Sequence, residues 1–140
     1  MIKKALLSLS LLALTLPVPA PAAGPATLAL SPSSGSFLTG GTFDVSIILD
    51  TKGQSVNLVE VELIFPANKL QITNPSVGKS LIQVWPSPPT FSNSKGRAYF
   101  VGGIPSPGIN TSNGVVLTLT FRAITPGSAT ISFGDLTRVL

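Results

Sequence analysis

Apolar and polar residues alternate with a period of two along much of this sequence, as they do in half-buried β-strands. After Gly40-Gly41 the inward positions are Phe43, Val45, Ile47 and Leu49, and the outward positions are Asp44, Ser46 and Ile48. The segment from Val56 to Phe65 predicts a second strand. Its inward residues are Val59, Val61, Leu63 and Phe65, and its outward residues are Leu58, Glu60, Glu62 and Ile64. Each segment is therefore expected to bury one face.

Later segments repeat the alternation. In Val115–Arg122 the inward set is Val115, Leu117, Leu119 and Phe121, and the outward set is Val116, Thr118, Thr120 and Arg122. Ala129, Ile131 and Phe133 pattern a last strand. Shorter strands are expected at Thr27–Ser31, Lys69–Thr73, Leu81–Trp85 and Arg97–Val101, with turns at Pro32–Gly35 and at Pro86. About eight to nine short strands, with no helical period after the first 23 residues, predict an all-β antiparallel β-sandwich.

The first residues have the three parts of a secretory signal peptide. Lys3 and Lys4 are the basic part, Ala5–Leu16 is an uncharged run, and Ala20 and Ala22 supply the small-x-small pattern. The run is too short to cross a bilayer. We expect a signal peptide at 1–22, a secreted domain at 23–140 and no membrane span in the mature chain. Its last strand, at the apolar end of the sequence, is expected to be cut short.

The composition excludes several classes of site. The 140 residues contain no Cys and no His, and only 10% are charged. Disulfides, thiolate catalysis, Cys-ligated zinc and histidine general-base catalysis are therefore excluded. Asp44, Asp50 and Asp135 are too far apart in sequence to predict a calcium loop. We expect no catalytic residues, no metal site and no cofactor.

The charge pattern also excludes one class of partner. Without Lys3 and Lys4, seven Lys and Arg remain against five Asp and Glu, and the basic residues are scattered along the chain. Nucleic-acid binding requires a basic stripe with stacking aromatic residues. We therefore expect no nucleic-acid partner.

The order of several motifs is more specific than any of them alone. A Gly-x-x-Phe strand opening at Gly40–Val45 precedes Ser55–Leu70, where a strand ends in an aromatic residue and a Pro-x-x-Leu-like step. Gly114–Ala123 then reads Gly-Val-x-x-x-Leu-Thr-Phe, and Pro126–Ile131 follows it. In this order and spacing the motifs resemble a bacterial cohesin domain. The resemblance covers nearly all of Ala26–Phe133.

The resemblance implies a fold and a function. Cohesins are jelly-roll β-sandwiches that bind calcium-loaded dockerin modules and assemble polysaccharide-degrading enzymes outside the cell. The docking surface is the outward face of the sheet that contains the third strand. The matching positions here are Leu58, Glu60, Glu62 and Ile64, an apolar centre bordered by carboxylates. The expected partner is a dockerin-type module that carries its own calcium.

Two alternatives stay open, and a third is disfavoured. Trp85 and Tyr99 are candidates for stacking on sugars, which would make the chain a carbohydrate-binding module that binds polysaccharide directly. The domain could also be a structural cell-surface domain without a ligand. A glycosidase pair of Glu60 and Glu62, about 6.6 Å apart along one strand, is disfavoured, because catalysis requires carboxylates across a cleft with one pKa raised.

Overall fold

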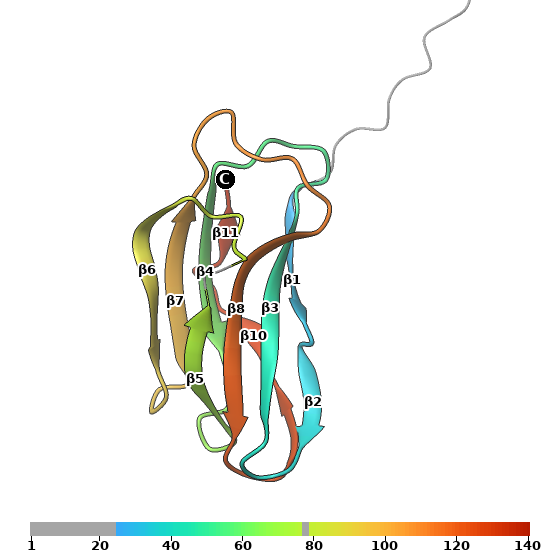
Figure 1. Cartoon of the computed structure of the whole chain (residues 1–140), viewed down its shortest axis with the longest axis vertical. Coiled ribbons are helices and arrows are strands. Elements are labelled where there is room, and N and C mark those ends of the chain that lie inside the picture. The colour runs from blue at the N-terminus through green and yellow to red at the C-terminus, as the bar shows by residue number, and fades with distance from the viewer. Residues whose placement is uncertain (1–24, 77–78) are drawn as a thin grey trace, which may run out of the picture.

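Two antiparallel sheets pack face to face in this protein (Figure 1). The computed structural model describes residues 25–76 and 79–140, so the expected signal peptide at 1–22 lies outside the described residues. The first sheet has the order β1 (Thr27–Ser31), β3 (Thr42–Asp50), β8 (Gly114–Ala123) and β5 (Leu70–Ser76). The second sheet has the order β10 (Ser132–Phe133), β4 (Leu58–Ile64), β7 (Arg97–Gly103) and β6 (Val84–Ser92), and β11 (Arg138–Val139) also pairs with β4.

β2 (Ser34–Phe37) and β9 (Gly127–Thr130) pair as a separate, short two-stranded antiparallel sheet. The described residues thus form eleven strands and no helix, which confirms the predicted antiparallel β-sandwich. Within residues 25–76 and 79–140, the structure has no helix of the length and apolarity that a membrane span requires.

The core lies between the inward faces of the two sheets, as the alternation predicts. From the first sheet Val45, Ile47 and Leu49 are fully buried, and the second sheet contributes Val59, Val61 and Leu63. Each of these side chains is at most 1% exposed. The period-two pattern in β3 and β4 therefore identifies the residues that drive the sheets together.

One part of the alternation was predicted wrongly. Ile47 pairs with Leu117 and Ile48 pairs with Val115, so Val116 is an extra residue in β8 opposite the β3 pair. Such a bulge breaks the alternation. Val116 is fully buried, whereas Val115 is half-buried and lines a cleft on the outer face of the sheet. The two valines have exchanged the faces expected of them.

The edge strand β6 departs from the expectation that a strand ends at Pro86. The strand runs from Val84 to Ser92 and contains Pro86, Pro88 and Pro89. Its pairing with β7 is irregular, with register shifts on both sides of Ser87. Proline is tolerated here because an edge strand has one side without a ladder partner, where the missing N–H is not needed.

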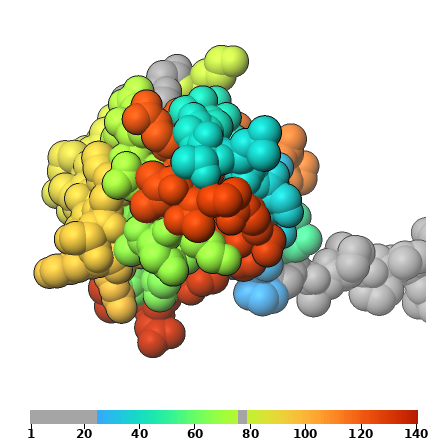
Figure 2. All heavy atoms as spheres, turned by 90° about the horizontal axis from the view of Figure 1, so that it is seen from below, coloured from blue at the N-terminus to red at the C-terminus, as the bar shows by residue number. Residues whose placement is uncertain are grey.

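Ser34–Phe37 is a strand rather than part of the expected turn, and it brings an aromatic cluster to one end of the sandwich. The Phe37 ring stacks on Phe43 at 3.8 Å between centroids, and Phe43 stacks on Phe121 at 5.7 Å. Phe65 meets Phe121 edge to face. Figure 2 views this end, where the β2–β3 connection (cyan), the β8–β9 turn (orange) and the β4–β5 connection (green) come together. The cluster closes the core between the two sheets.

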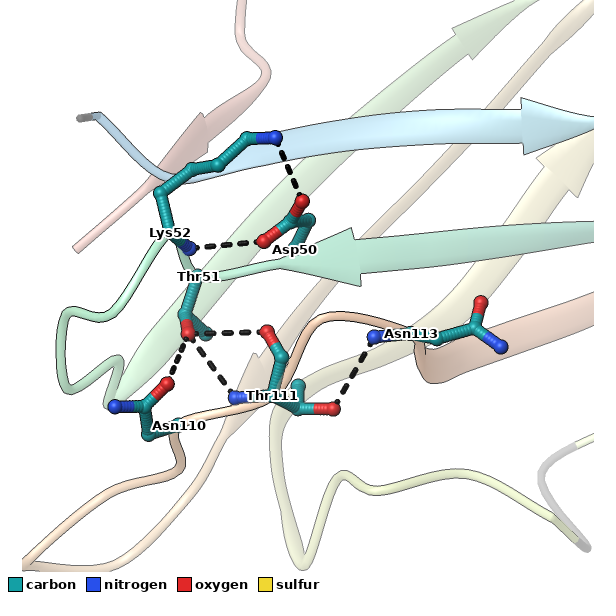
Figure 3. Close-up of polar contacts among 6 residues, drawn as sticks. All are labelled: Asp50, Thr51, Lys52, Asn110, Thr111 and Asn113. Atoms are coloured by element: carbon teal, nitrogen blue, oxygen red, sulfur yellow. Dashed lines mark hydrogen bonds and ion pairs between the residues drawn. The ribbon is translucent and has the colours of Figure 1, made fainter. Parts of the chain in front are cut away.

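A buried threonine ties the opposite end together. Thr51 follows β3 and is fully buried, and its backbone N–H donates to Thr111 O at 2.8 Å. Its hydroxyl accepts from Thr111 N at 3.0 Å and lies 2.9 Å from Asn110 Oδ1 (Figure 3). Beside it, Asp50 pairs with Lys52. These bonds fix the β7–β8 connection against the end of β3.

The bulge predicts that a polar substitution destabilises the protein more at Val116 than at Val115. A simple period-two alternation predicts the opposite order. Val116→Thr places a hydroxyl in the core and should lower the free energy of unfolding by about 1–3 kcal/mol. The matched control Val115→Thr changes the same atoms on the outer face and should cost clearly less. Urea denaturation of both variants measures the two costs. A larger loss at Val115 than at Val116 would contradict the bulge.

Candidate functional site

The outer face of β4 carries the predicted site residues in an unexpected order. Leu58 and Ile64 lie at the two ends of the strand, while Glu60 and Glu62 occupy its middle. The expectation of an apolar centre bordered by carboxylates is therefore wrong. Glu60 and Glu62 also keep only 9% and 8% of their surface exposed. β7 pairs with β4 along one edge, and β10 and β11 pair with it along the other.

Glu60 is held by two donors from neighbouring strands. Tyr99 of β7 donates its hydroxyl to Glu60 Oε1 at 2.7 Å, and Arg138 of β11 pairs with Glu60 Oε2 through Nε. The Tyr99 hydrogen bond, followed by the Arg138 guanidinium, holds the pKa of Glu60 below its usual value, although burial acts in the opposite direction. The same hydrogen bond raises the pKa of Tyr99.

Glu62 is enclosed by β7 and by the segment between β10 and β11. Arg97 of β7 pairs with Glu62 Oε1, and the Leu136 N–H donates to Glu62 Oε2 at 3.4 Å. The Glu62 backbone accepts from Gly134 N at 2.8 Å and exchanges two hydrogen bonds with the Thr137 hydroxyl. We call these contacts of Glu62 with residues 134–137 the Glu62 clip. They leave Glu62 little freedom to move.

These contacts argue against catalysis by the two glutamates. A general acid needs a raised pKa, and the surroundings of Glu60 lower its pKa. Both carboxylates lie side by side on one strand and are paired with arginines. Their arrangement suits a rigid surface rather than proton transfer to a substrate.

Trp85 and Tyr99, the candidate sugar platform, are not brought together on one face. The Trp85 ring meets the buried Phe100 edge to face, with centroids 5.7 Å apart. Tyr99 is adjacent to Phe100 in β7, so its side chain projects to the opposite side of the sheet, where it reaches Glu60. The two rings therefore do not form a common stacking surface.

The other outer face of the sandwich is polar. Thr120 donates to Asp44 Oδ1 at 2.6 Å, and the Ser46 and Thr118 hydroxyls are 3.0 Å apart. Together with Asn74 and other residues they line an open cleft of about 690 Å³. These strands, β3 and β8, present hydroxyl groups rather than buried ion pairs.

The residues that hold Glu60 and Glu62 were identified only in part from the sequence. The strand expected at Arg97–Val101 is present as β7 and pairs with β4, but neither Arg97 nor Tyr99 was assigned to a glutamate. Arg138 was missed because the end of the sequence was treated as an unfinished strand. The only available signal was the outward pair Glu60 and Glu62, which, once covered, require cationic or hydroxyl partners.

The lowered pKa of Glu60 predicts an acid-dependent loss of stability. The charged form is favoured in the fold, so its stabilisation is present above the ordinary glutamate pKa of 4.5 and is lost as pH falls through the lower folded value. Glu60→Gln should therefore be less stable than the natural chain at about pH 7, and the gap should narrow toward about pH 3. Thermal melts across this range measure it, with Asp135→Asn as the control for one lost charge. A gap that is constant with pH would contradict the assignment.

Gly134 gives a test of the Glu62 clip. A Cβ at this position would overlap the Glu62 carboxylate, so Gly134→Ala should push Glu62 away from Arg97 and lower the free energy of unfolding by about 1–3 kcal/mol. In a Glu62→Ala background the same change should cost much less, because the overlap is gone. Chemical denaturation of the four proteins gives the coupling energy. Equal costs in both backgrounds would refute the clip.

Comparison with known proteins places the fold. No protein-family model and no curated protein matches the sequence. CaCohA2 from Clostridium acetobutylicum, solved in solution, is 15% identical, with a TM-score of 0.61 over 82% of this chain and 78% of that chain. The second type II cohesin module of the adaptor scaffoldin ScaA from Acetivibrio cellulolyticus is 14% identical, with a TM-score of 0.61 over 83% and 73%.

A third match is a complex. A type I cohesin–dockerin complex from Clostridium thermocellum gives 15% identity and a TM-score of 0.56 over 71% of this chain and 77% of that chain. The identities are low, and the likeness lies in the arrangement of the strands. It confirms the resemblance that the order of the sequence motifs indicates: this protein has the fold of a cohesin module.

Proposed function

We propose that this chain is an exported, non-catalytic docking module that binds a calcium-loaded dockerin-type partner in an extracellular polysaccharide-degrading assembly. The binding surface is the outer face of the sheet of β10, β11, β4, β7 and β6, which we call the β4 face. Export rests on the signal-peptide pattern at 1–22. Partner binding rests on the shared fold, because several structural neighbours are cohesins described in complex with dockerins.

The observation that carries the proposal is the set of hydrogen bonds and ion pairs that orders the β4 face. Its central glutamates are fixed by partners from β7 and from the C-terminal segment. A surface whose side chains are already ordered loses little conformational entropy on binding. The adjoining apolar residues, Leu58 and the exposed Ile64, supply area for contact with a partner.

The apolar contact area extends past the end of β4. Ile64 also lines a groove of about 500 Å³ at the end of the sandwich, together with Pro66, Ala129 and Ser132. A partner on the β4 face could place an apolar side chain there. By contrast, the positions of Trp85 and Tyr99 on opposite sides of one sheet give direct polysaccharide binding less support.

A paired binding assay tests the function. The chain from residue 23 onward is used to capture secreted proteins of the source organism, with calcium and with a chelator, beside an insoluble-polysaccharide binding assay. The proposal expects calcium-dependent recovery of a dockerin-bearing enzyme and no retention on polysaccharide. Retention on polysaccharide without a protein partner would overturn it in favour of a carbohydrate-binding module.

Two truncations locate the surface. Leu58→Ala combined with Ile64→Ala should weaken dockerin binding at least about fivefold, since truncating the residues that anchor an interface costs about 1 kcal/mol or more. Ile48→Ala, on the outer face of the other sheet, is the matched control and should leave affinity unchanged. Calorimetric titration of each variant measures the change. Loss of affinity in the Ile48 variant alone would contradict the proposed surface and indicate that the partner binds the outer face of the other sheet.

A further inference from the structure

We infer that the β4 face recognises its partner through Arg97 and Arg138, and that the partner presents acidic side chains to them. This inference rests on the proposed docking function and specifies the chemistry of that same surface. It assigns recognition to these two arginines rather than to Glu60 and Glu62, the charged residues that the sequence analysis matched to the docking surface.

The two ion pairs are oriented with their positive ends toward solvent. The Arg97 side chain is 54% exposed, while the Glu62 side chain paired with it is 11% exposed. The Arg138 side chain is 64% exposed and that of Glu60 is 12% exposed. An approaching molecule therefore meets the guanidinium groups first, and the carboxylates lie beneath them.

The carboxylate oxygens are already occupied. Glu60 accepts from Tyr99 and Arg138, and Glu62 accepts from Arg97 and from the Leu136 N–H. Each of the four oxygens thus has a donor within the chain. A lysine or arginine of a partner could reach these nearly buried carboxylates only past the exposed arginines, whose positive charge would repel it.

The arginines, in contrast, have donors to spare. A guanidinium carries five N–H groups in a planar fork that matches a carboxylate. Arg97 reaches Glu62 through Nη1, and Arg138 reaches Glu60 through Nε. The remaining N–H groups can bind an incoming carboxylate in a bidentate manner without breaking the internal pairs.

Two further charged side chains, Lys95 and Asp135, lie near the β4 face and are compatible with an acidic partner. Lys95, in the turn between β6 and β7, is exposed and adds a positive charge at one end of the face. Asp135, between β10 and β11, is the exposed carboxylate closest in sequence to the clip on Glu62. Because Glu60 and Glu62 are covered, a partner meets the positive charges of Arg97, Arg138 and Lys95 and the negative charge of Asp135 before it meets the two glutamates. The positive charges complement an acidic surface.

The test uses defined partners and matched variants. Each calcium-loaded dockerin module encoded in the source genome is immobilised singly, and the chain from residue 23 onward is titrated over it. Arg97→Gln and Arg138→Gln are compared with Arg122→Gln, which removes the same charge from an exposed position in β8 on the other sheet. Arg97→Lys and Arg138→Lys keep the charge beside the glutamates, and thermal melts of all variants report whether each still folds.

The expected result is that each Gln substitution raises the Kd about tenfold or more, equivalent to about 1.4 kcal/mol, while the Arg122 variant binds normally. The Lys variants should bind with intermediate affinity, since they keep charge but lose the planar fork. Neutralising Asp or Glu residues of the bound module should reproduce the loss, and added salt should weaken binding.

Two other outcomes are distinguishable. If none of the dockerin modules binds the natural chain, the docking function itself fails, and this inference fails with it. If a module binds but tolerates both Gln variants, and instead loses affinity when its own Lys or Arg residues are neutralised, docking stands and the acidic-partner inference is overturned.

Discussion

Two carboxylates on the outside of a sheet are shielded from water, and their burial requires a donor for each oxygen. Glu60 and Glu62 obtain those donors from β7 and from the last residues of the sequence. Segments that are 35 to 78 residues apart are thereby fixed in one register. The position of β11, the clip around Glu62 and the outward direction of the arginines all follow from this requirement.

The need to pair buried carboxylates also distinguishes the two outer faces of the sandwich. The face of β3 and β8 carries hydroxyl groups in an open polar cleft. The β4 face is ordered by charged pairs and is bordered by Leu58 and Ile64. An ordered, partly apolar surface is the better candidate for a protein partner, because less freedom is lost on binding.

The sequence predicted the core better than it predicted the surface. Inward positions such as Ile47 and Leu63 follow from the period-two pattern, because one face of each strand must be buried. The faces of Val115 and Val116 were predicted the wrong way round, because a bulge depends on the register with β3, which local alternation does not encode. The partners of Glu60 were not predictable for a related reason: Tyr99 and Arg138 reach it only after distant strands have paired. Tyr99 was a candidate for sugar stacking, in the alternative interpretation, because of its residue type, whereas its position makes it a hydrogen-bond donor to Glu60.

Hydrogen–deuterium exchange on the complex would show directly whether the partner docks on the β4 face. The chain would be compared free and bound to the calcium-loaded dockerin module that it captures. Docking on the β4 face predicts slowed exchange in β7, in β6 and in residues 134–140, with little change in β3 and β5. Protection confined to β3, β8 and β5, with the β4 face unchanged, would contradict it.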